Sequence, residues 1–442
     1  MRGNAGGMLR YGMFLVLLML SQSPAAAKDI HIDPRAATGG DGSAKRPFAS
    51  IEKVLAGNPG QGARLVLASG FYGDLVLREV QGLTVQDADG DAVFSSVVIA
   101  DSSDVVLRAL TVDWARRQPQ AGDGESSRNS AVRVDRSRGI TIDGLTIRSA
   151  EDGSRWSAEE WRARAASGIT AQGQDLVIRN NRLFYVRHGI QLTGSHGVIE
   201  GNTVAHFSGD GLRAIGDFNT VQDNNVHSCY AVDKNHDDGF QSWSLGPDGR
   251  PGAGVSRGTV LRRNTFLGYV KPGHPLQCRL QGIGLFDGIY EDWLIENNLV
   301  VVDHWHGITV MGARRVVIRN NTVFDPADNR VGPAGVRILP HKDGRQPVGS
   351  LIANNLAPRK SKAWPKGFPP VRGGVEYLGN VFYGNPRNVF RDPEALDLRP
   401  HAKSFGTDYA KGDGPKDDLT GYPRPWGKRA DVGAYEYRGD GQ

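Results

Sequence analysis

The chain has 442 residues, of which 39% are hydrophobic and 23% charged, and its formal net charge is +5 at pH 7. These proportions are typical of a folded chain rather than a disordered one. Glycine contributes 58 residues, about twice the usual share of roughly 7%, but the glycines follow no three-residue period, which excludes collagen. Runs rich in Leu, Glu and Lys are scarce, which disfavours a helical bundle. No Arg-rich run alternates with aromatic residues, so nucleic acid is not expected as a partner. Many short β-branched runs between glycines predict a β architecture with many turns.

The first 27 residues have the features of a secretory signal peptide. Arg2 and Arg10 form a basic region, residues 14–20 (FLVLLML) are apolar, and residues 25–27 (AAA) offer a cleavage site of small residues. No apolar run reaches 18 residues, so no membrane span is expected. The signal peptide predicts a periplasmic or secreted protein of residues 28–442. Without residues 1–27 the net charge falls from +5 to +3.

Two short helices are expected among the strands. Residues 46–55 (RPFASIEKVL) predict an amphipathic helix that covers the first coil, within an N-terminal cap of about residues 28–60. A second helix is predicted to start at Ser157, where Glu160 completes a capping box. Residues 64–112 supply further strands.

A repeated five-residue pattern indicates the architecture. It consists of a polar or small residue, glycine, an apolar residue, a polar or small residue, and a mostly apolar residue. The glycines of the seven copies are Gly168, Gly189, Gly211, Gly239, Gly282, Gly307 and Gly335. Most copies are 21 to 28 residues apart, and the longer step from Gly239 to Gly282 predicts an inserted loop.

Asparagines recur in phase with this pattern, each near the end of a short strand. They are Asn181, Asn202, Asn225, Asn264, Asn298, Asn321 and Asn355. One asparagine per turn places the amides in a column, where they can hydrogen-bond to one another and to the turn backbone. Short strands at this spacing predict a solenoid with parallel sheets, with coils over about residues 61–356 and an irregular loop and tail over about residues 357–442.

The start of the mature chain (HIDPRAATGGDGSAKRPFASIEKVL), its coils and its tail (DLTGYPRPWGKRADVGAYEY, from Asp418) resemble secreted proteins of the pectate-lyase-like superfamily. The resemblance covers nearly the whole mature chain. It implies an all-β fold, a right-handed parallel β-helix in a single domain, which we expect to be a monomer. It does not select a reaction, because this fold carries lyases, hydrolases, epimerases and phage tailspikes.

Two polar columns follow from the register of the repeat. The residues before the seven glycines are Ser167, His188, Asp210, Asp238, Gln281, His306 and Ala334. The residues two places after each glycine are Thr170, Gln191, Arg213, Gln241, Gly284, Thr309 and Arg337. Equivalent positions on neighbouring parallel strands lie about 4.8 Å apart on one face. Acids, imidazoles and guanidinium groups gathered there predict a catalytic groove rather than a merely solvated face.

The densest group of titratable residues lies just before the fourth glycine-marked strand. It contains Tyr230, Asp233, Lys234, His236, Asp237 and Asp238. With Asp210 it gathers four carboxylates, which repel one another unless protons or a cation intervene. A Ca²⁺ ion held by Asp210, Asp233, Asp237 and Asp238 is therefore one expectation.

Three activities could use this groove. β-Elimination on a uronate polymer needs a base, an acid and a group that neutralises the sugar carboxylate. The candidate acids and bases are Tyr230, Lys234, His236, His188 and His306, and the candidate neutralising groups are Arg213, Arg337 or Ca²⁺. The run from Tyr230 through Asp233 to His236 is similar to a segment of alginate C5-epimerases, which share the proton-abstraction step.

The second activity is inverting hydrolysis, for which Asp210 on one coil and Asp237 and Asp238 on the next resemble the polygalacturonase arrangement. The third is glycan binding without catalysis, with Trp243, Trp293 and Trp305 as aromatic contacts, although Trp293 is expected to pack inside a loop. Gln191, Gln241, Trp243 and Arg337 are the predicted substrate contacts. We expect an acidic polysaccharide as the partner and prefer β-elimination, because imidazoles and basic groups outnumber what a hydrolase needs.

The chain contains two cysteines, Cys229 and Cys278. They are too few for a disulfide scaffold, and their spacing is not that of a zinc site. By the repeat count they lie on adjacent coils, so a disulfide is expected in an oxidising compartment.

Overall fold

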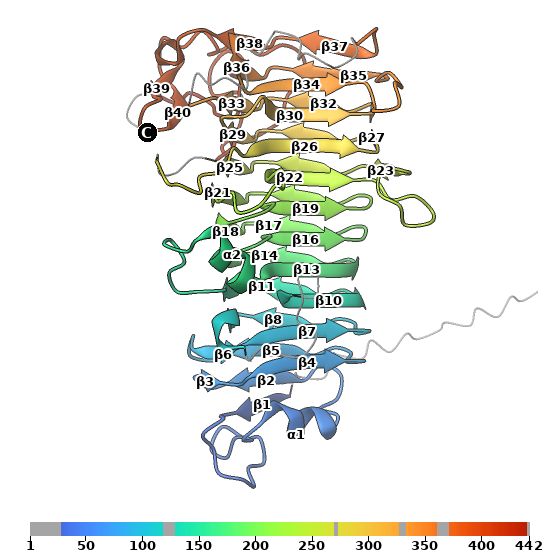
Figure 1. Cartoon of the computed structure of the whole chain (residues 1–442), viewed down its shortest axis with the longest axis vertical. Helices are drawn as coiled ribbons and strands as arrows, with labels where there is room; N and C mark the ends of the chain where they lie inside the picture. The colour runs from blue at the N-terminus through green and yellow to red at the C-terminus, as the bar shows by residue number, and fades with distance from the viewer. Residues whose placement is uncertain (1–27, 118–128, 269–272, 327–332, 360–370, 440–442) are drawn as a thin grey trace, which may run out of the picture.

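The computed structural model describes residues 28–117, 129–268, 273–326, 333–359 and 371–439. The predicted signal peptide, residues 1–27, lies outside this part of the chain. Within the described residues, three long sheets stack their strands along one axis, from β1 near one end to β38 near the other (Figure 1). Every strand pair in these three sheets is parallel, as the repeat predicts. None of the described helices is long and apolar enough to cross a membrane.

The strands of the described residues are grouped here by sheet, in the order in which they stack. The thirteen-strand sheet contains β1 (Asp29–Ile32), β2 (Arg64–Leu67), β5 (Thr84–Asp87), β8 (Val106–Arg108), β11 (Thr141–Asp143), β14 (Val177–Arg179), β17 (Val198–Glu200), β20 (Thr220–Gln222), β24 (Val260–Arg262), β28 (Leu294–Glu296), β32 (Val317–Arg319), β35 (Ser350–Ala353) and β37 (Val375–Leu378). The twelve-strand sheet contains β3 (Gly70–Phe71), β6 (Ala92–Phe94), β9 (Thr111–Asp113), β12 (Thr146–Arg148), β15 (Arg182–Val186), β18 (Thr203–Phe207), β21 (Asn225–Cys229), β25 (Thr265–Leu267), β29 (Leu299–Val301), β33 (Thr322–Phe324), β36 (Leu356–Pro358) and β38 (Val381–Tyr383). The ten-strand sheet contains β4 (Asp74–Arg78), β7 (Ser96–Ala100), β10 (Ser130–Arg138), β13 (Ser167–Gln174), β16 (Ile190–Thr193), β19 (Leu212–Ile215), β22 (Asp238–Trp243), β26 (Gln281–Asp287), β30 (His306–Met311) and β34 (Gly335–Leu339).

Two smaller sheets and four short helices accompany the three long sheets among the described residues. A side sheet is formed by β23 (Val255–Arg257), β27 (Ile289–Glu291) and β31 (Ala313–Arg314), and β39 (Phe390–Asp392) pairs antiparallel with β40 (Asp397–Pro400). The helices are α1 (Ile51–Ala56), η1 (Trp114–Arg116), α2 (Ala158–Arg164) and η3 (Pro386–Asn388). Helix α1 is shorter than the sequence predicts and buries Ile51 and Val54. The capping box of α2 is confirmed, with Ser157 and Glu160 each accepting from the other's backbone nitrogen.

The core is built from side chains that occupy the same place on successive strands. In the thirteen-strand sheet one such row pairs strand by strand and is at most 2% exposed; it consists of Ile178, Ile199, Val221, Leu261, Ile295, Ile318 and Ile352. Each coil therefore buries its apolar residues on the coils above and below, which is the reason a single coil is not stable alone. The stacking extends beyond the expected limits of residues 61–356, because β1, β37 and β38 also join the sheets.

The asparagine column is confirmed as a buried ladder. The side-chain oxygen of each member accepts from the backbone and amide nitrogens of the member before it; the members are Asn181, Asn202, Asn224, Asn264, Asn298, Asn321, Asn355 and Asn380. Two details differ from the sequence prediction. The prediction of Asn225 as a ladder member is wrong by one residue, because Asn225 is exposed at the start of β21 and Asn224 occupies the ladder position. Asn380 adds a member beyond the predicted coils.

Replacing Asn298 by alanine should lower the free energy of unfolding by about 1–3 kcal/mol, because it leaves buried backbone groups without partners. Asn298 is fully buried, and its amide nitrogen donates to the carbonyl oxygens of Leu261 and Glu296. Urea unfolding would measure the loss. Asn225→Ala is the matched control, since this neighbouring asparagine is exposed, and an equal loss in both variants would contradict the assignment.

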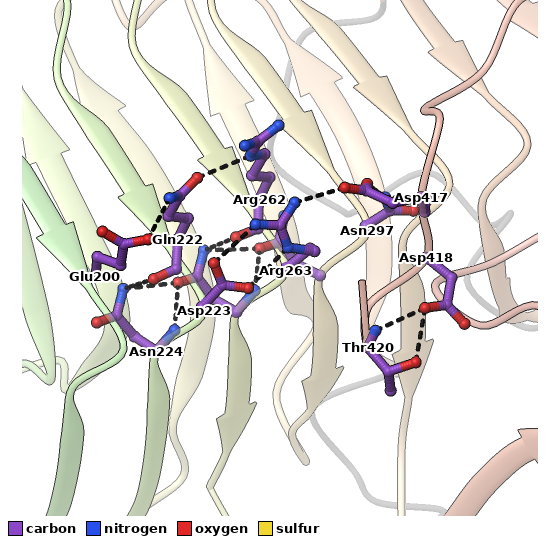
Figure 2. A network of polar contacts seen from close by, with 12 residues as sticks. Glu200, Gln222, Asp223, Asn224, Arg262, Arg263, Asn297, Asp417, Asp418 and Thr420 are labelled. Carbon is purple, nitrogen blue, oxygen red and sulfur yellow. Dashed lines mark hydrogen bonds and ion pairs between the residues drawn. The ribbon is translucent and has the colours of Figure 1, made fainter. Parts of the chain in front are cut away.

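The C-terminal tail is tied to the turns of the solenoid by polar contacts (Figure 2). Arg263 donates to Asp223 on one side and to Asp417 of the tail on the other, at 2.7 and 2.8 Å. The amide nitrogen of Asn297 donates to the carbonyl oxygen of Asp417 at 2.8 Å. In the same way, the amide nitrogen of Asn320 donates to the carbonyl oxygen of Asp431, and that of Asn354 donates to the carbonyl oxygen of Lys411. The tail therefore runs along several coils, as its warm-coloured trace beside the sheets indicates in Figure 1.

Candidate functional site

The polar column predicted from the repeat is present on the ten-strand sheet; its members Gln191, Arg213 and Gln241 are partly exposed, whereas Thr309 and Arg337 are buried. Its members pair directly, strand by strand, in the order Arg133, Thr170, Gln191, Arg213, Gln241, Gly284, Thr309 and Arg337. The side chain three residues earlier in each coil often contacts the column member. Asp210 contacts Arg213, Asp238 contacts Gln241, and His306 contacts Thr309.

Asp210 and Arg213 form a buried ion pair at the start of β19. The guanidinium Nε of Arg213 donates to Oδ2 of Asp210 at 2.6 Å, and Oδ1 of Asp210 accepts from the backbone nitrogen of Asp238 at 2.9 Å. Arg213 also donates to Gln191 at 3.0 Å, and its guanidinium lies 5.6 Å from the ring centre of Trp243. Burial raises the pKa of Asp210, and Arg213 opposes this effect. Asp210, 1% exposed, therefore holds the neighbouring groups in place rather than facing an open groove.

Asp238 lies on the next coil, at the first position of β22, and is completely buried. Its Oδ2 accepts from the amide of Gln241 at 3.1 Å, whereas its Oδ1 has no hydrogen-bond partner among the described residues. Burial and the nearby carboxylates of Asp210 and Asp237 raise the pKa of Asp238 well above its usual value. Arg213 pairs directly with Asp210 and favours its ionised form, so the proton belongs on Asp238.

Asp237 is the third buried carboxyl of the cluster, at 6% exposure. Its Oδ1 accepts from Asn235 at 3.3 Å, and its Oδ2 lies 3.6 Å from the sulfur of Cys229. Burial is the main reason that its pKa is raised to about 7. This carboxyl therefore exchanges its proton near neutral pH, as a general acid or base must.

The pH dependence of stability should report Asp237. The unfolded chain loses this proton near pH ~4, whereas the folded chain keeps it up to a pKa of about 7. Stability should therefore fall as the pH rises through this window, because the folded state binds more protons there. Stability should fall by about 4 kcal/mol across this window, and Asp237→Asn should remove this fall. Urea unfolding at both ends, with wild type in parallel, measures the difference, and identical pH profiles would contradict it.

The loop before β22 carries three exposed charged or polar candidates, Asp233, Lys234 and His236. Asp233 lies 3.8 Å from Arg187, and His236 lies close enough to His304 and His306 to lower the pKa of both. The loop is held by the predicted disulfide, which is present between Cys229 and Cys278, with 5.5 Å between their Cα atoms.

Loss of this disulfide should lower the free energy of unfolding by about 2–4 kcal/mol, because it frees a loop closed over a separation of 49 residues. A Cys229→Ala, Cys278→Ala double variant, compared with wild type by urea unfolding, measures the effect. Titration of the unfolded, unreduced wild type should find no free thiols. Two free thiols would contradict the bridge in solution.

His188 and His306 both lie beside the polar column, but neither is charged at neutral pH. Burial lowers the pKa of His188 well below its usual value, and its Nδ1 accepts from the backbone nitrogen of Asp210 at 2.9 Å. Burial and the nearby His304 lower the pKa of His306 to about 2. Arg337 completes the far end of the column, where it donates to the carbonyl oxygen of Trp305 and lies 5.5 Å from that ring.

Two aromatic candidates lie away from this cluster. Tyr230 belongs to a separate buried cluster over the twelve-strand sheet, with Trp161 and Tyr185, and its hydroxyl contacts Nδ1 of His206 at 3.1 Å. Trp293 has a structural role, as predicted, but it packs in the core against Tyr290 rather than inside a loop.

The four carboxylates do not fit a shared calcium site. Both oxygens of Asp210 already accept hydrogen bonds, and a guanidinium group lies within the cluster. Among the described residues, the group of three ligand-type side chains within 4.8 Å of one another is Cys229, Asp237 and Cys278, and its two sulfurs are bonded together. We therefore derive no chemistry through a metal ion.

Three residues of this region were missed by the sequence prediction. His304 stacks on His306 with ring centres 5.2 Å apart, and Phe286 contacts the same ring at 4.7 Å. Arg279 is exposed, and its positive charge adds to the effect of burial in lowering the pKa of His304. The His-Trp-His run at residues 304–306 was a visible signal, whereas Phe286 and Arg279 follow no repeat pattern.

Comparison with known families agrees with this geometry. The family model described as the right handed beta helix region matches residues 79–229 and 167–343, which together span more than half of the chain. The chain belongs to the right-handed β-helix family. The predicted right-handed parallel β-helix is thus confirmed.

Solved structures are similar to this chain at low sequence identity. The complex of XylC with xylose is similar at a TM-score of 0.54 and 11% identity, over 93% of this chain and 98% of that one. Pectate lyase Pel9A gives a TM-score of 0.45 and 13% identity, over 94% and 98%. The GH136 lacto-N-biosidase from Eubacterium ramulus gives 0.44 and 12%, and the match covers 72% of this chain but only 65% of that protein. The likeness to XylC shows the fold alone, and no curated protein sequence matches significantly.

Proposed function

We propose that this protein is a secreted or periplasmic enzyme that cleaves an acidic, uronate-containing polysaccharide by β-elimination. The observation that carries the proposal is the pair of buried carboxyls, Asp237 and Asp238, beside the polar column of the ten-strand sheet, where Asp238 accepts from Gln241. Burial raises the pKa of both carboxyls. A protonated carboxyl in this position suits the donor that protonates a leaving glycosidic oxygen.

The charge distribution favours an anionic substrate. Arg213 and Arg337 lie in the column itself, and the exposed side chains of Lys234, His236 and Arg279 lie on the loops beside it. A guanidinium group is suited to a sugar carboxylate, because it can form two parallel hydrogen bonds with it. Neutralising that carboxylate is what makes the adjacent C–H proton removable.

The remaining role is the base. His236 is exposed beside the column, and an imidazole in its neutral form can accept the proton next to the sugar carboxylate. Arg213 or Arg337 would hold the carboxylate, and Asp238 or Asp237 would protonate the leaving oxygen. Gln191, Gln241 and Trp243 are partly exposed along the same face and would contact the flanking sugars.

Secretion is proposed from residues outside the described part of the chain and from the disulfide. A structural disulfide is typical of oxidising compartments, which agrees with cleavage of a signal peptide after residue 27. N-terminal sequencing of the exported protein should begin at Lys28.

A panel of uronate polymers tests the reaction. The expected product carries a new double bond, seen as ultraviolet absorbance that grows together with reducing ends. Reducing ends without absorbance would instead indicate inverting hydrolysis, for which the acids on adjacent coils at β19 and β22 would serve. A change of sugar configuration without cleavage would indicate a C5-epimerase, and tight binding without any product would indicate a binding protein. A chelator should not abolish the activity; if it does, Ca²⁺ takes part after all.

A further inference from the structure

The polar column contains one glycine, Gly284, and the oxygen Oδ1 of Asp238, which has no hydrogen-bond partner among the described residues, lies next to it. Gly284 stands between Gln241 and Thr309 in the strand-by-strand register. A Cβ atom placed on Gly284 would lie 2.5 Å from Oδ1 of Asp238, so even alanine would press on this oxygen. Glycine therefore leaves a notch in the polar face, with an unpartnered acid oxygen at its floor.

The notch is filled by Phe286. The same Cβ would lie 2.4 Å from the ring of Phe286, and that ring contacts the imidazole of His306, with centres 4.7 Å apart. Phe286 is placed there by a β-bulge: Ser242 pairs with Leu285 and Trp243 pairs with Asp287, so Phe286 is the extra residue between them. Bulges redirect side chains and are frequent beside active sites.

We propose that the notch at Gly284 is the binding subsite for one uronate ring of the glycan, and that the Phe286 side chain is the gate that fills the notch until the sugar displaces it. The inference rests on the proposed function for the identity of the sugar. Displacement of the ring would bring Oδ1 of Asp238 into contact with the substrate, which the fully buried carboxyl otherwise lacks. The ring's apolar face suits stacking on a pyranose, and its partial exposure leaves one side open for movement.

The column places cations symmetrically around this subsite. Arg213 lies two strands before Gly284 and Arg337 two strands after it, about 10 Å away on either side at the usual strand spacing. Neighbouring sugars on both sides would therefore meet a guanidinium group. This arrangement fits a chain that carries a carboxylate on successive rings better than a single charged sugar.

Chemical labelling of Asp238 tests the gate without requiring activity. A carbodiimide with glycine ethyl ester modifies accessible carboxyls, and mass spectrometry of the peptides locates the label. Asp238 should be protected in the wild type and labelled about tenfold faster or more in Phe286→Ala, since a closed gate leaves an open state populated at about 10% or less. Phe218→Ala is the matched control, because this half-exposed ring stacks on His196 elsewhere on the surface.

Unchanged melting curves must accompany the labelling, so that general unfolding is separated from opening of the gate. Equal labelling of Asp238 in the wild type and in folded Phe286→Ala would overturn the gate. Trigalacturonate or trimannuronate, whichever the wild type binds, should protect Asp238 again in Phe286→Ala. Failure of both sugars to protect would overturn the subsite.

Gly284→Ala provides the second arm. Its methyl group would press on both the Phe286 ring and Oδ1 of Asp238, so a sugar could not enter at this position and the folded variant should not cleave, whereas cleavage at the wild-type rate would overturn the subsite. The two proposals fail separately. A wild type that cleaves uronate polymers while Asp238 stays protected in Phe286→Ala refutes the gate alone. A wild type that cleaves none, with fast labelling in Phe286→Ala, refutes the proposed function and retains the gate.

Discussion

Replacing Arg213 by alanine should lower the free energy of unfolding by about 3–5 kcal/mol, because it leaves Asp210 without its cation. Asp210 is 1% exposed, and both of its oxygens are engaged, one by Arg213 and the other by the backbone of Asp238. Removing one member of a buried ion pair destabilises the fold by more than the intact pair stabilises it, because the remaining charge stays buried without a partner. Urea unfolding at neutral pH is the measurement.

The matched control is Arg133→Ala. Arg133 occupies the same polar column three strands earlier and lies 3.2 Å from Asp135, but both side chains are about a quarter exposed. Its loss should change stability by less than about 1 kcal/mol, as for other exposed pairs. The interpretation of Asp210 as a buried partner would be wrong if both variants lost the same amount.

Asp238→Asn should reduce the cleavage rate by about 10²-fold or more while the fold is retained, because it removes the proton that the proposed acid donates. Asparagine has nearly the shape of a neutral carboxylic acid, and its amide can occupy the same space between Gln241 and Gly284. The rate is measured on the polymer that the wild type cleaves. Asp175→Asn is the control, since this carboxylate is exposed and pairs with Arg138 on a distant turn.

Stability distinguishes a chemical role of Asp238 from a structural one. Its pKa is raised in the folded state, so the wild type loses stability as the pH rises from about 4 toward neutral. Asp238→Asn removes this loss and should be as stable as the wild type at neutral pH, or more stable. An inactive variant that is also strongly destabilised at neutral pH would argue that Asp238 supports the coil and not the reaction.

The buried position of the acids changes how the candidate groove is understood. The sequence places Asp210 and Asp238 on a face where acids, imidazoles and arginines gather, and that face exists. The structure adds that the acids lie beneath the column and that Arg213, Gln191 and Gln241 form its partly exposed surface. Access to Asp238 then depends on Gly284 and Phe286.

The repeat by itself determined the architecture of this protein. Glycine at a constant place before an apolar strand, and asparagine at a constant place at a turn, are local signals that recur from coil to coil, the glycines from Gly168 to Gly335 and the asparagines from Asn181 to Asn380. Because each coil packs only on its neighbours, a periodic sequence translates directly into a periodic structure. The parallel sheets, the asparagine ladder and the Cys229–Cys278 bridge followed from this logic, whereas the capping box of α2 followed from a separate local motif. The slip from Asn224 to Asn225 arose because two asparagines adjoin, and only the backbone shows which side chain turns inward.

The tertiary structure alone decided the chemistry of the site. A sequence column shows which residues share a face, but burial and hydrogen bonding determine which of them hold protons. Arg213 neutralises Asp210 and leaves the proton on Asp238, and Tyr230, although close in sequence, packs into another cluster. Phe286 was invisible to the repeat, because a bulge breaks the two-residue alternation of a strand. The reason is physical: periodicity specifies positions along the solenoid, whereas pKa values and access depend on contacts between loops and coils that no period encodes.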